Sequence, residues 1–309
     1  MNLPRITLVS PSYNQAQFLQ ATLDSVVAQN YPNLEWIVMD GGSADGSVEI
    51  LRRYEKHFSF WTSERDAGQA DALQRGFARA TGEILSWLNS DDVLRPNALR
   101  TVGEYFAAHP ECDFLTGDGV FINAEGTREL FYVRGAPYSF AELLQYCNEK
   151  FLPQPSVFFS RASFERVGGL DVTLHYALDL DLWLRLRAEF KLVYVPHCFS
   201  QMRVHAHAKT QDAHQPGLRE VARVTRRYWN RVGRAERVGL WFSLRRMQAR
   251  EYCKQGLARV LEQDHRAGWR ALSDALQRDP FILTTPAAQR LMGRLVLPRA
   301  LRQRFLRVP

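Results

Sequence analysis

Short apolar runs alternate with amphipathic segments along the first ninety residues. The apolar runs cover residues 5–10, 34–39, 58–62 and 84–88. The amphipathic segments cover residues 18–29, 47–54 and 70–80. Strands that alternate with helices need crossover connections, and such connections favour a mostly parallel sheet. The pattern therefore predicts an α/β fold with helices flanking the sheet.

Small, polar or acidic residues follow each of the four runs. They are Pro11-Ser12-Tyr13-Asn14, Asp40-Gly41-Gly42, Asp66 with Gly68, and Asn89-Ser90-Asp91-Asp92. The carboxyl ends of parallel strands meet at one rim of a sheet, where open α/β sheets bind ligands. Glycines allow close backbone approach, turn amides bind phosphates, and carboxylates accept from ribose or base groups. The set predicts a nucleotide site, although βα loops of any α/β fold are rich in Gly, Asp and Ser.

Two adjacent carboxylates, Asp91 and Asp92, follow the fourth run after Asn89-Ser90. Neighbouring anions repel each other unless a cation or a hydrogen-bonded ligand lies between them. Oxygen ligands suit a hard divalent ion such as Mg²⁺ or Mn²⁺. Taken alone, a polar turn that caps the next helix explains these residues equally well. The other three strand ends favour the metal site.

The middle of the chain predicts further elements of the same domain. We expect a helix at 98–109, a strand at 114–118, a hairpin of strands 120–123 and 130–133, a helix at 139–146 and an apolar strand from Val157. Residues 178–186 are ambiguous, because leucines alternate as in a strand. A helix from Asp179 with an Asp181–Arg185 pair also fits. A strand at 192–195 leads towards Arg203, His205 and Lys209.

Four motifs together resemble an inverting GT-A glycosyltransferase of family 2, the group that builds bacterial surface polysaccharides. They are Ser10-Pro11-Ser12-Tyr13-Asn14, Asp40-Gly41-Gly42-Ser43-Ala44-Asp45-Gly46-Ser47, Ser63-Glu64-Arg65-Asp66-Ala67-Gly68 and Leu88-Asn89-Ser90-Asp91-Asp92. The resemblance covers residues 5 to about 210, and it makes the ambiguous segment after residue 178 a helix. It implies a Rossmann-like domain over residues 1–216. The nucleotide-sugar half would be about 1–118 and the acceptor half about 119–216.

The resemblance also implies roles for the matched residues. Asp179 matches the catalytic base, which is compatible with a helix cap. Asp92 and His205 are the expected metal ligands, with Mg²⁺ or Mn²⁺ as cofactor. The expected donor-binding residues are Pro11, Ser12, Tyr13, Asn14, Asp40, Gly41, Gly42, Asp66, Gly68, Asn89, Ser90, Asp91, Arg203 and Lys209. Among these, Asp40 would hold the base imide and Asp91 would face the ribose or diphosphate.

Three positions depart from the family pattern. The usual Asp-Asp-Gly-Ser is Asp40-Gly41-Gly42-Ser43 here, and the common Leu-Asp-x-Asp-Asp has Asn89 at its second position. Both changes remove a negative charge near the expected diphosphate. The glutamate that usually precedes the base is Leu178. Loss of that charge reduces the like-charge elevation of the Asp179 pKa.

Charge is distributed unevenly along the chain, whose net charge is +7. Residues 217–309 have 21 Lys and Arg against 7 Asp and Glu, whereas residues 1–216 have 19 against 26. We expect a basic helical extension over 217–309, including a helical hairpin at 255–276 and an interfacial helix at 291–306. An anionic membrane surface is the expected partner. A solvated basic face is the alternative, and nucleic acid is disfavoured.

The termini and cysteines bear on location. The apolar stretch from Ile6 to Val9 is too short for a signal peptide, and no apolar run approaches the roughly 18 residues of a spanning helix. Cys112, Cys147, Cys198 and Cys253 match no zinc or redox spacing. We expect a cytoplasmic protein with free thiols, attached at most peripherally to the inner face of the cell membrane.

The sequence predicts transfer of a sugar from a UDP- or GDP-sugar to a glycan or lipid-linked glycan. Two other functions stay open. A sugar-nucleotidyltransferase shares the acidic strand ends, but it needs a Gly-rich basic loop that residues 10–16 lack. A non-catalytic nucleotide-sugar-binding protein is the other alternative.

Overall fold

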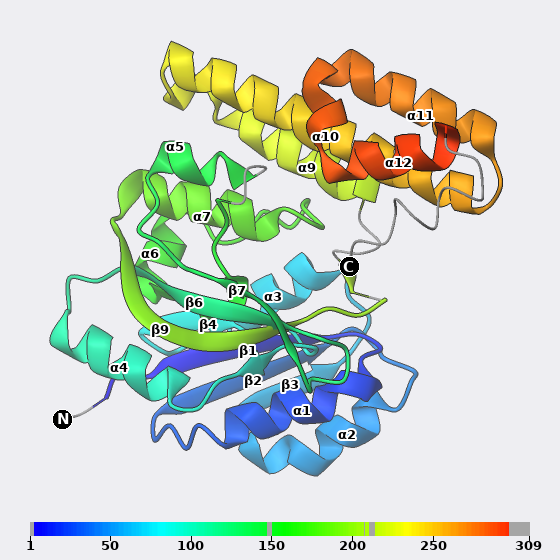
Figure 1. Ribbon diagram of the computed structural model, residues 1–309. Coiled ribbons are helices and arrows are strands. Elements are labelled where there is room, and N and C mark those ends of the chain that lie inside the picture. Colours follow the sequence, from blue (N-terminus) through cyan, green and yellow to red (C-terminus); the bar gives the residue numbers. More distant parts are fainter. Residues whose placement is uncertain (1–2, 147–149, 207, 210–213, 297–309) are drawn as a thin grey trace. The chain divides into compact units, whose positions relative to one another are not determined.

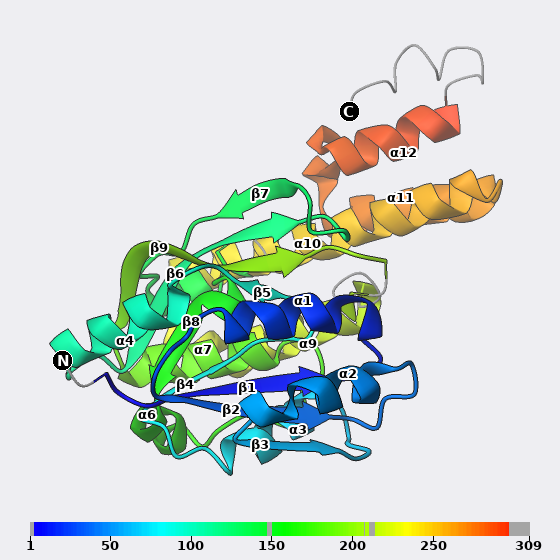
Figure 2. The same ribbon diagram turned by 90° about the horizontal axis from the view of Figure 1, so that it is seen from below.

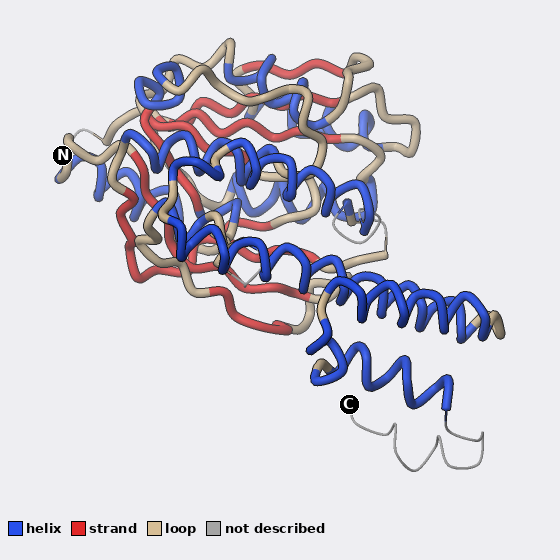
Figure 3. The backbone as a smooth tube through the Cα atoms, turned by 90° about the horizontal axis from the view of Figure 1, so that it is seen from above, coloured by secondary structure: helices blue, strands red, loops and turns tan. Residues whose placement is uncertain are grey.

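The computed structural model describes residues 3–146, 150–206, 208–209 and 214–296 (Figure 1). The chain divides into two compact units, with the division in sequence near residue 212. The first unit contains a mixed, mostly parallel sheet flanked by helices. The described part of the second unit contains helices and short connections (Figure 3).

The first four strands are parallel neighbours in the order β3-β2-β1-β4 (Figure 2). They are β1 (Ile6–Ser12), β2 (Leu34–Asp40), β3 (Phe60–Ser63) and β4 (Ile84–Trp87). The connecting helices are α1 (Ala16–Val27), α2 (Ser47–Tyr54) and α3 (Gln69–Phe77). The predicted alternation of strands and helices is confirmed, so the polar residues after these strands lie along one rim.

The other strands make the sheet mixed. Antiparallel β8 (Val157–Ser160) lies between β4 and β6 (Phe114–Ile122), and β9 (Leu192–Arg203) is parallel to β6. The predicted hairpin forms from β6 and β7 (Glu129–Val133). Two-residue β5 (Val93–Leu94) pairs with β9. The helices are α4 (Ala98–Ala108), α5 (Phe140–Leu143), α6 (Arg161–Arg166) and α7 (Leu178–Glu189).

Two strands run further than their apolar stretches predict. The expected strands at 114–118 and 120–123 are one strand, β6. A Cβ at Gly119 would lie 2.8 Å from Pro153 Cβ, so the glycine serves close packing and does not end the strand. Strand β9 continues beyond residue 195 to Arg203, because the whole of β6 pairs with it. This extension brings Arg203 to the end of β4.

The segment 178–189 is a helix, as the family resemblance predicts. The alternating leucines misrepresent it because α7 is buried on nearly all sides, so no polar face marks the helical period. Trp183 stacks on Trp87 of β4 with ring centroids 5.2 Å apart. Asp181 is fully buried and bonds Arg185 Nε at 2.8 Å. The tryptophan stack packs α7 against the sheet, and the ion pair lies within the helix.

The second unit contains α9 (His214–Arg227), α10 (Arg234–Leu261), α11 (His265–Arg278) and α12 (Pro286–Val296). The predicted helical hairpin is confirmed in the pairing of α10 with α11, although α10 is much longer than expected. A Cβ at Gly256 would lie 2.7 Å from Ala271 Cβ, so the two helices approach closely. The expected interfacial segment 291–306 is described only to Val296, and there it belongs to α12.

Two further sequence expectations concern the described residues. None of the helices in the described ranges is long and apolar enough to cross a membrane. Cys112, Cys198 and Cys253 are free thiols, and burial raises the pKa of Cys112 and of Cys253 to about 11. Cys147 lies outside the described residues.

Candidate active site

Asp40 at the end of β2 is the centre of a tight turn. Its carboxylate accepts hydrogen bonds from the N–H groups of Gly42 (3.2 Å) and Ser43 (2.9 Å). It also accepts from the hydroxyls of Ser43 (2.6 Å) and Ser63 (2.7 Å). Gly42 has a φ of +81°, which favours glycine. Asp40 therefore joins the ends of β2 and β3 at the rim.

Gly41 and Asp66 lie in close contact beside that turn. A Cβ at Gly41 would lie 2.8 Å from Asp66 Oδ2, so only glycine leaves this carboxylate in place. The other oxygen, Asp66 Oδ1, accepts the Gly68 N–H at 2.8 Å. Gly68 has a φ of +114°, and a Cβ there would lie 3.5 Å from His175 Nδ1. The family motif has a second Asp at the position of Gly41. Asp66 can pack here because that side chain is absent.

The end of β1 is bonded to the same turn. The Gly41 N–H donates to the Ser12 carbonyl at 2.8 Å. Asn14, in the left-handed region with a φ of 51°, donates its N–H to Ser43 Oγ and accepts the Ala44 N–H. The Ser12 hydroxyl is buried and has no partner among the described residues. Tyr13 is 62% exposed, whereas Pro11 is buried in β1.

Asp92 lies in the loop after β4, and both carboxylate oxygens accept hydrogen bonds. Oδ1 accepts the Arg203 N–H at 3.0 Å, and Oδ2 accepts the Asn89 amide at 3.3 Å. Burial, and then the charge of Asp91, raise the pKa of Asp92 well above its usual range. A cation near this loop would offset that cost.

Asp91 faces His205, with Oδ2 3.0 Å from Nε2. The imidazole packs on the Phe18 ring at 4.3 Å, and its buried Nδ1 has no partner among the described residues. The Arg203 guanidinium donates to the carbonyls of Asp91 (3.0 Å) and Ala124 (2.8 Å). Arg203 therefore holds the loop through its main chain.

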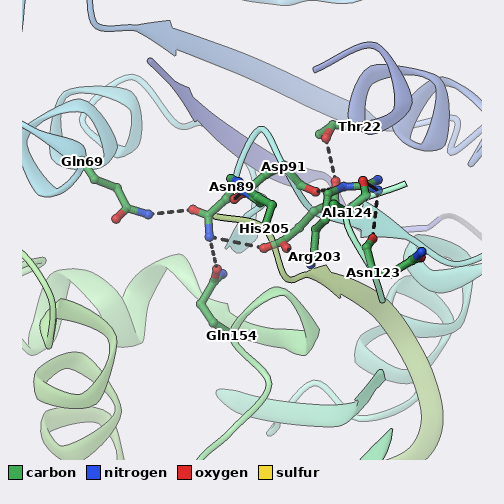
Figure 4. A network of polar contacts seen from close by, with 10 residues as sticks. Thr22, Gln69, Asn89, Asp91, Asn123, Ala124, Gln154, Arg203 and His205 are labelled. Carbon is green, nitrogen blue, oxygen red and sulfur yellow. Dashed lines mark hydrogen bonds and ion pairs between the residues drawn. The ribbon is translucent and has the colours of Figure 1, made fainter. Parts of the chain in front are cut away.

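Asn89 is the centre of an amide network at the same loop (Figure 4). Its Oδ1 accepts from Gln69 Nε2 at 2.6 Å, and its Nδ2 donates to Gln154 Oε1 at 3.1 Å. Lys209 Nζ in turn donates to Gln69 Oε1 at 2.7 Å. Neighbouring Ser90 is buried. Asn89 thus replaces an expected carboxylate with a residue that both donates and accepts.

Asp179 lies in the first turn of α7 and is half-buried. Oδ1 accepts the Leu180 N–H at 2.7 Å, and Oδ2 has no hydrogen-bond partner in the described parts of the chain. Burial raises the pKa of Asp179, and the charge of Lys209 partly offsets this rise. Since Lys209 also bonds Gln69, one cation lies near both Asp179 and the β4 loop.

A divalent metal fits the donor atoms of Asp91 and His205. A carboxylate oxygen and an imidazole nitrogen lie side by side there. Within the described residues, no cluster of three or more His, Cys, Asp or Glu side chains could hold an ion. Mg²⁺ and Mn²⁺ sites that act on phosphates often use one or two protein ligands and complete their shell from substrate. Asp92 is more enclosed, because both oxygens already accept N–H groups.

Several residues of the site lie outside the motifs that predict it. Gln69 and Gln154 position Asn89, and the Thr22 hydroxyl donates to the Asp92 carbonyl at 2.7 Å. His175 lies against Gly68. A glutamine at the start of a helix or after a proline is common, so sequence alone does not single these residues out. The position of Gln69 directly after Gly68 is the one available clue.

The sheet order, the acidic loop after β4 and the acidic first turn of α7 together define a GT-A-type transferase. Residues 7–168 match the family model described as glycosyl transferase family 2, and the chain belongs to that family. An uncharacterized glycosyltransferase of Mycobacterium tuberculosis is 32% identical over 185 residues, which are 59% of this chain and 68% of that protein. A putative teichuronic acid biosynthesis glycosyltransferase of Bacillus subtilis is 33% identical over 107 residues, which are 33% of this chain and 42% of that protein.

Solved structures show the same fold. Residues 1–349 of S. aureus TarS, in complex with UDP-GlcNAc, align with a TM-score of 0.58 and 14% identity over 94% of this chain and 89% of that one. A longer TarS structure is covered to 54% of its length. The mannosyltransferase PcManGT from Pyrobaculum calidifontis, in complex with GDP-Man and Mn2+, aligns with a TM-score of 0.53 and 18% identity. The alignment covers 99% of this chain and 84% of that one.

Proposed function

We propose that the protein is an inverting glycosyltransferase that moves a sugar from a UDP- or GDP-sugar to a hydroxyl of a glycan. The acceptor would be a growing or lipid-linked glycan in surface polysaccharide synthesis. The observation that carries the proposal is Asp179, a half-buried carboxylate of raised pKa beside Lys209, which bonds Gln69, the hydrogen-bond partner of Asn89 in the β4 loop. The family and the nucleotide sugars bound to TarS and PcManGT support the donor class.

Asp179 serves as the general base in this proposal. The acceptor hydroxyl gives its proton to Asp179 while its oxygen bonds to the anomeric carbon. The bond from that carbon to the diphosphate oxygen breaks on the opposite face, and its electron pair leaves with the nucleoside diphosphate. A carboxylate whose pKa is raised by burial is a stronger base than an exposed one. Leu180 N–H fixes one oxygen, so the other can meet the hydroxyl.

The β4 loop receives the diphosphate. Asp91 and His205 would hold the metal, which supplies positive charge against the charge that develops on the leaving diphosphate. That Asp92 is itself a ligand stays a prediction. Asn89 and Arg203 fix Asp92 through its two oxygens. Asn89 adds no charge of its own, so the loop repels a diphosphate less than the usual family motif does.

The nucleoside would lie along the ends of β1, β2 and β3. The buried Ser12 hydroxyl can bond a ribose or base group, and Tyr13 offers an exposed ring. Asp66 Oδ2 lies over Gly41 with only Oδ1 bonded to Gly68. Asp40 already accepts four hydrogen bonds, so its part in the proposal is to hold the ends of β2 and β3 together. Its contact with a base imide stays a prediction.

A screen of nucleotide sugars tests the proposal. The protein is melted with Mn²⁺ and each of a panel of UDP- and GDP-sugars, and the stabilised pairs are assayed for sugar transfer. A ligand at 100 times its Kd stabilises the folded state by about 2.7 kcal/mol. We expect one nucleotide class to stabilise the protein. Release of pyrophosphate from a nucleoside triphosphate and a sugar phosphate would instead support the nucleotidyltransferase.

A further inference from the structure

The helix α10 has a second apolar face besides the one that packs in the helical core. Leu240, Leu244, Cys253 and Val260 are buried. Val238, Trp241 and Phe242 are 56%, 45% and 59% exposed. These three residues are spaced by three and four positions, so they lie together on one side of the helix. We call them the α10 apolar face.

The α10 apolar face continues into a groove. The groove has a volume of about 290 Å³ and is lined by Trp229, Arg237, Val238, Trp241 and Phe242. The Trp241 and Phe242 rings meet edge to face with centroids 4.9 Å apart. This contact brings the two exposed rings together on one surface. Large aromatic side chains left in water on a helix commonly mark an interaction site.

Arginines border this face on both sides along the helix. Arg234 precedes Val238 by four residues, and Arg245 and Arg246 follow Trp241 and Phe242 by four. The Arg245 guanidinium lies 4.5 Å from the centroid of the Trp241 ring. Residues 229–246 contain five arginines and one acidic residue, Glu236. Glu236 accepts the Gly233 N–H at the start of α10.

We propose that the α10 apolar face binds an anionic phospholipid surface. Tryptophan and phenylalanine enter the boundary between headgroups and acyl chains, while Arg234 and Arg245 supply positive charge for anionic headgroups. Arg245 donates to the carbonyls of Gln277 and Arg278 and keeps its charge, whereas Arg246 is paired with Asp279 at 2.8 Å. A nucleic acid would use the aromatic rings as stacking platforms, but Val238 and the apolar groove offer no stacking partner. The surface therefore fits acyl chains better than bases. The inference concerns the second unit only and does not depend on sugar transfer.

Vesicle binding of the full chain tests the proposal. We compare phosphatidylglycerol vesicles with phosphatidylcholine vesicles by co-sedimentation. The double variant Trp241→Ala, Phe242→Ala removes two exposed rings. We expect its affinity for phosphatidylglycerol vesicles to fall by about tenfold or more. The matched control is Trp269→Ala, because Trp269 is 49% exposed on α11. It should bind as the wild type does. Equal binding of wild type and double variant would overturn the proposal.

A second measurement, fluorescence quenching, shows which tryptophan enters the acyl region, and it needs only Trp→Phe substitutions. Brominated phosphatidylglycerol quenches tryptophans that enter the acyl region. Trp241→Phe should lose most of the quenching, and Trp269→Phe should keep it. Quenching that survives Trp241→Phe would contradict the proposal. So would wild-type binding to phosphatidylcholine as strong as to phosphatidylglycerol, or loss of oligonucleotide binding in the double variant with vesicle binding intact.

Discussion

The loop after β4 and the first turn of α7 each present a carboxylate whose pKa is raised by burial, but their hydrogen bonds differ. Both oxygens of Asp92 accept protein N–H groups, from Arg203 and Asn89. One oxygen of Asp179 accepts the Leu180 N–H. A carboxylate with both oxygens bonded can fix the conformation of a loop and keep its negative charge in one position. A carboxylate with an open oxygen can take a proton from a ligand.

This difference separates two roles within one site. In the β4 loop, Asp92 is fixed by its two hydrogen bonds, and Asp91 offers a donor atom beside His205, which follows β9. The turn of α7 supplies the proton acceptor. Lys209 is near both, since it bonds Gln69 and its charge lowers the Asp179 pKa. Changes at each position should therefore affect binding and chemistry separately.

The largest effect is expected from Asp179→Asn. An amide cannot accept the hydroxyl proton, so the transfer rate should fall by about 100- to 10,000-fold. Metal-dependent binding of the nucleotide sugar, measured by calorimetry, should stay within about twofold because the β4 loop is unchanged. Retention of most of the activity would show that another group is the base.

Asp181→Asn is the matched control for that variant. Asp181 lies two residues further along α7, is fully buried and pairs with Arg185 at 2.8 Å. Removing one partner of a buried pair costs about 3–5 kcal/mol of stability. Its melting temperature should fall, while the rate per folded molecule should stay near that of the wild type.

The next largest effect is expected from Asp91→Asn or His205→Gln. Each removes one donor atom of the proposed metal pair, so the Mn²⁺ concentration for half-maximal activity should rise about 10- to 100-fold. Mn²⁺ binding in the presence of nucleoside diphosphate, followed by electron paramagnetic resonance, should weaken likewise. His109→Gln is the control, because His109 pairs with exposed Glu111. Unchanged Mn²⁺ binding in both variants would move the metal away from this pair.

Gly41→Ala should have a smaller effect, confined to donor binding. The new Cβ would lie 2.8 Å from Asp66 Oδ2 and would displace that carboxylate. Loss of one hydrogen bond to the nucleoside would weaken donor affinity by up to about tenfold. Gly239→Ala, where a Cβ meets nothing within 4 Å, should leave donor affinity unchanged. A donor affinity unaffected by Gly41→Ala would remove Asp66 from the nucleotide site.

The smallest effect is a shift of the pH profile in Lys209→Gln. The base must be ionised, so the rate falls as pH drops through the raised Asp179 pKa. The Lys209 charge lowers that pKa, and its loss should move the acid limb to higher pH. Glutamine can still bond Gln69. An acid limb that stays in place would show that Lys209 does not act on the base.

The apolar pattern predicts most of the first unit, because β1, β2 and β4 are buried, β3 is partly buried, and polar or acidic residues end or follow each strand. It misses β5, which is two residues long, and α6, which has six residues. Such short elements form because long neighbours pair or pack with them. The continuity of β6 depends likewise on its pairing with β9.

Motifs predict the carboxylates of the site but not the contacts among them. The pair of Asp91 and His205 joins residues 114 positions apart, and Asn89 and Gln154 are 65 apart. A single sequence carries no signal for such pairing. It also cannot show that Asp92 has both oxygens bonded while Asp179 has one, because this depends on where β9 ends.

The anomeric configuration of the product tests the central claim most directly. The nucleotide sugar selected by thermal stabilisation is incubated with its acceptor, and the new glycoside is followed by proton nuclear magnetic resonance from the first turnover. Attack assisted by Asp179 on the face opposite the diphosphate predicts a product of inverted configuration, absent with Asp179→Asn. A product that retains the configuration of the donor would contradict the account.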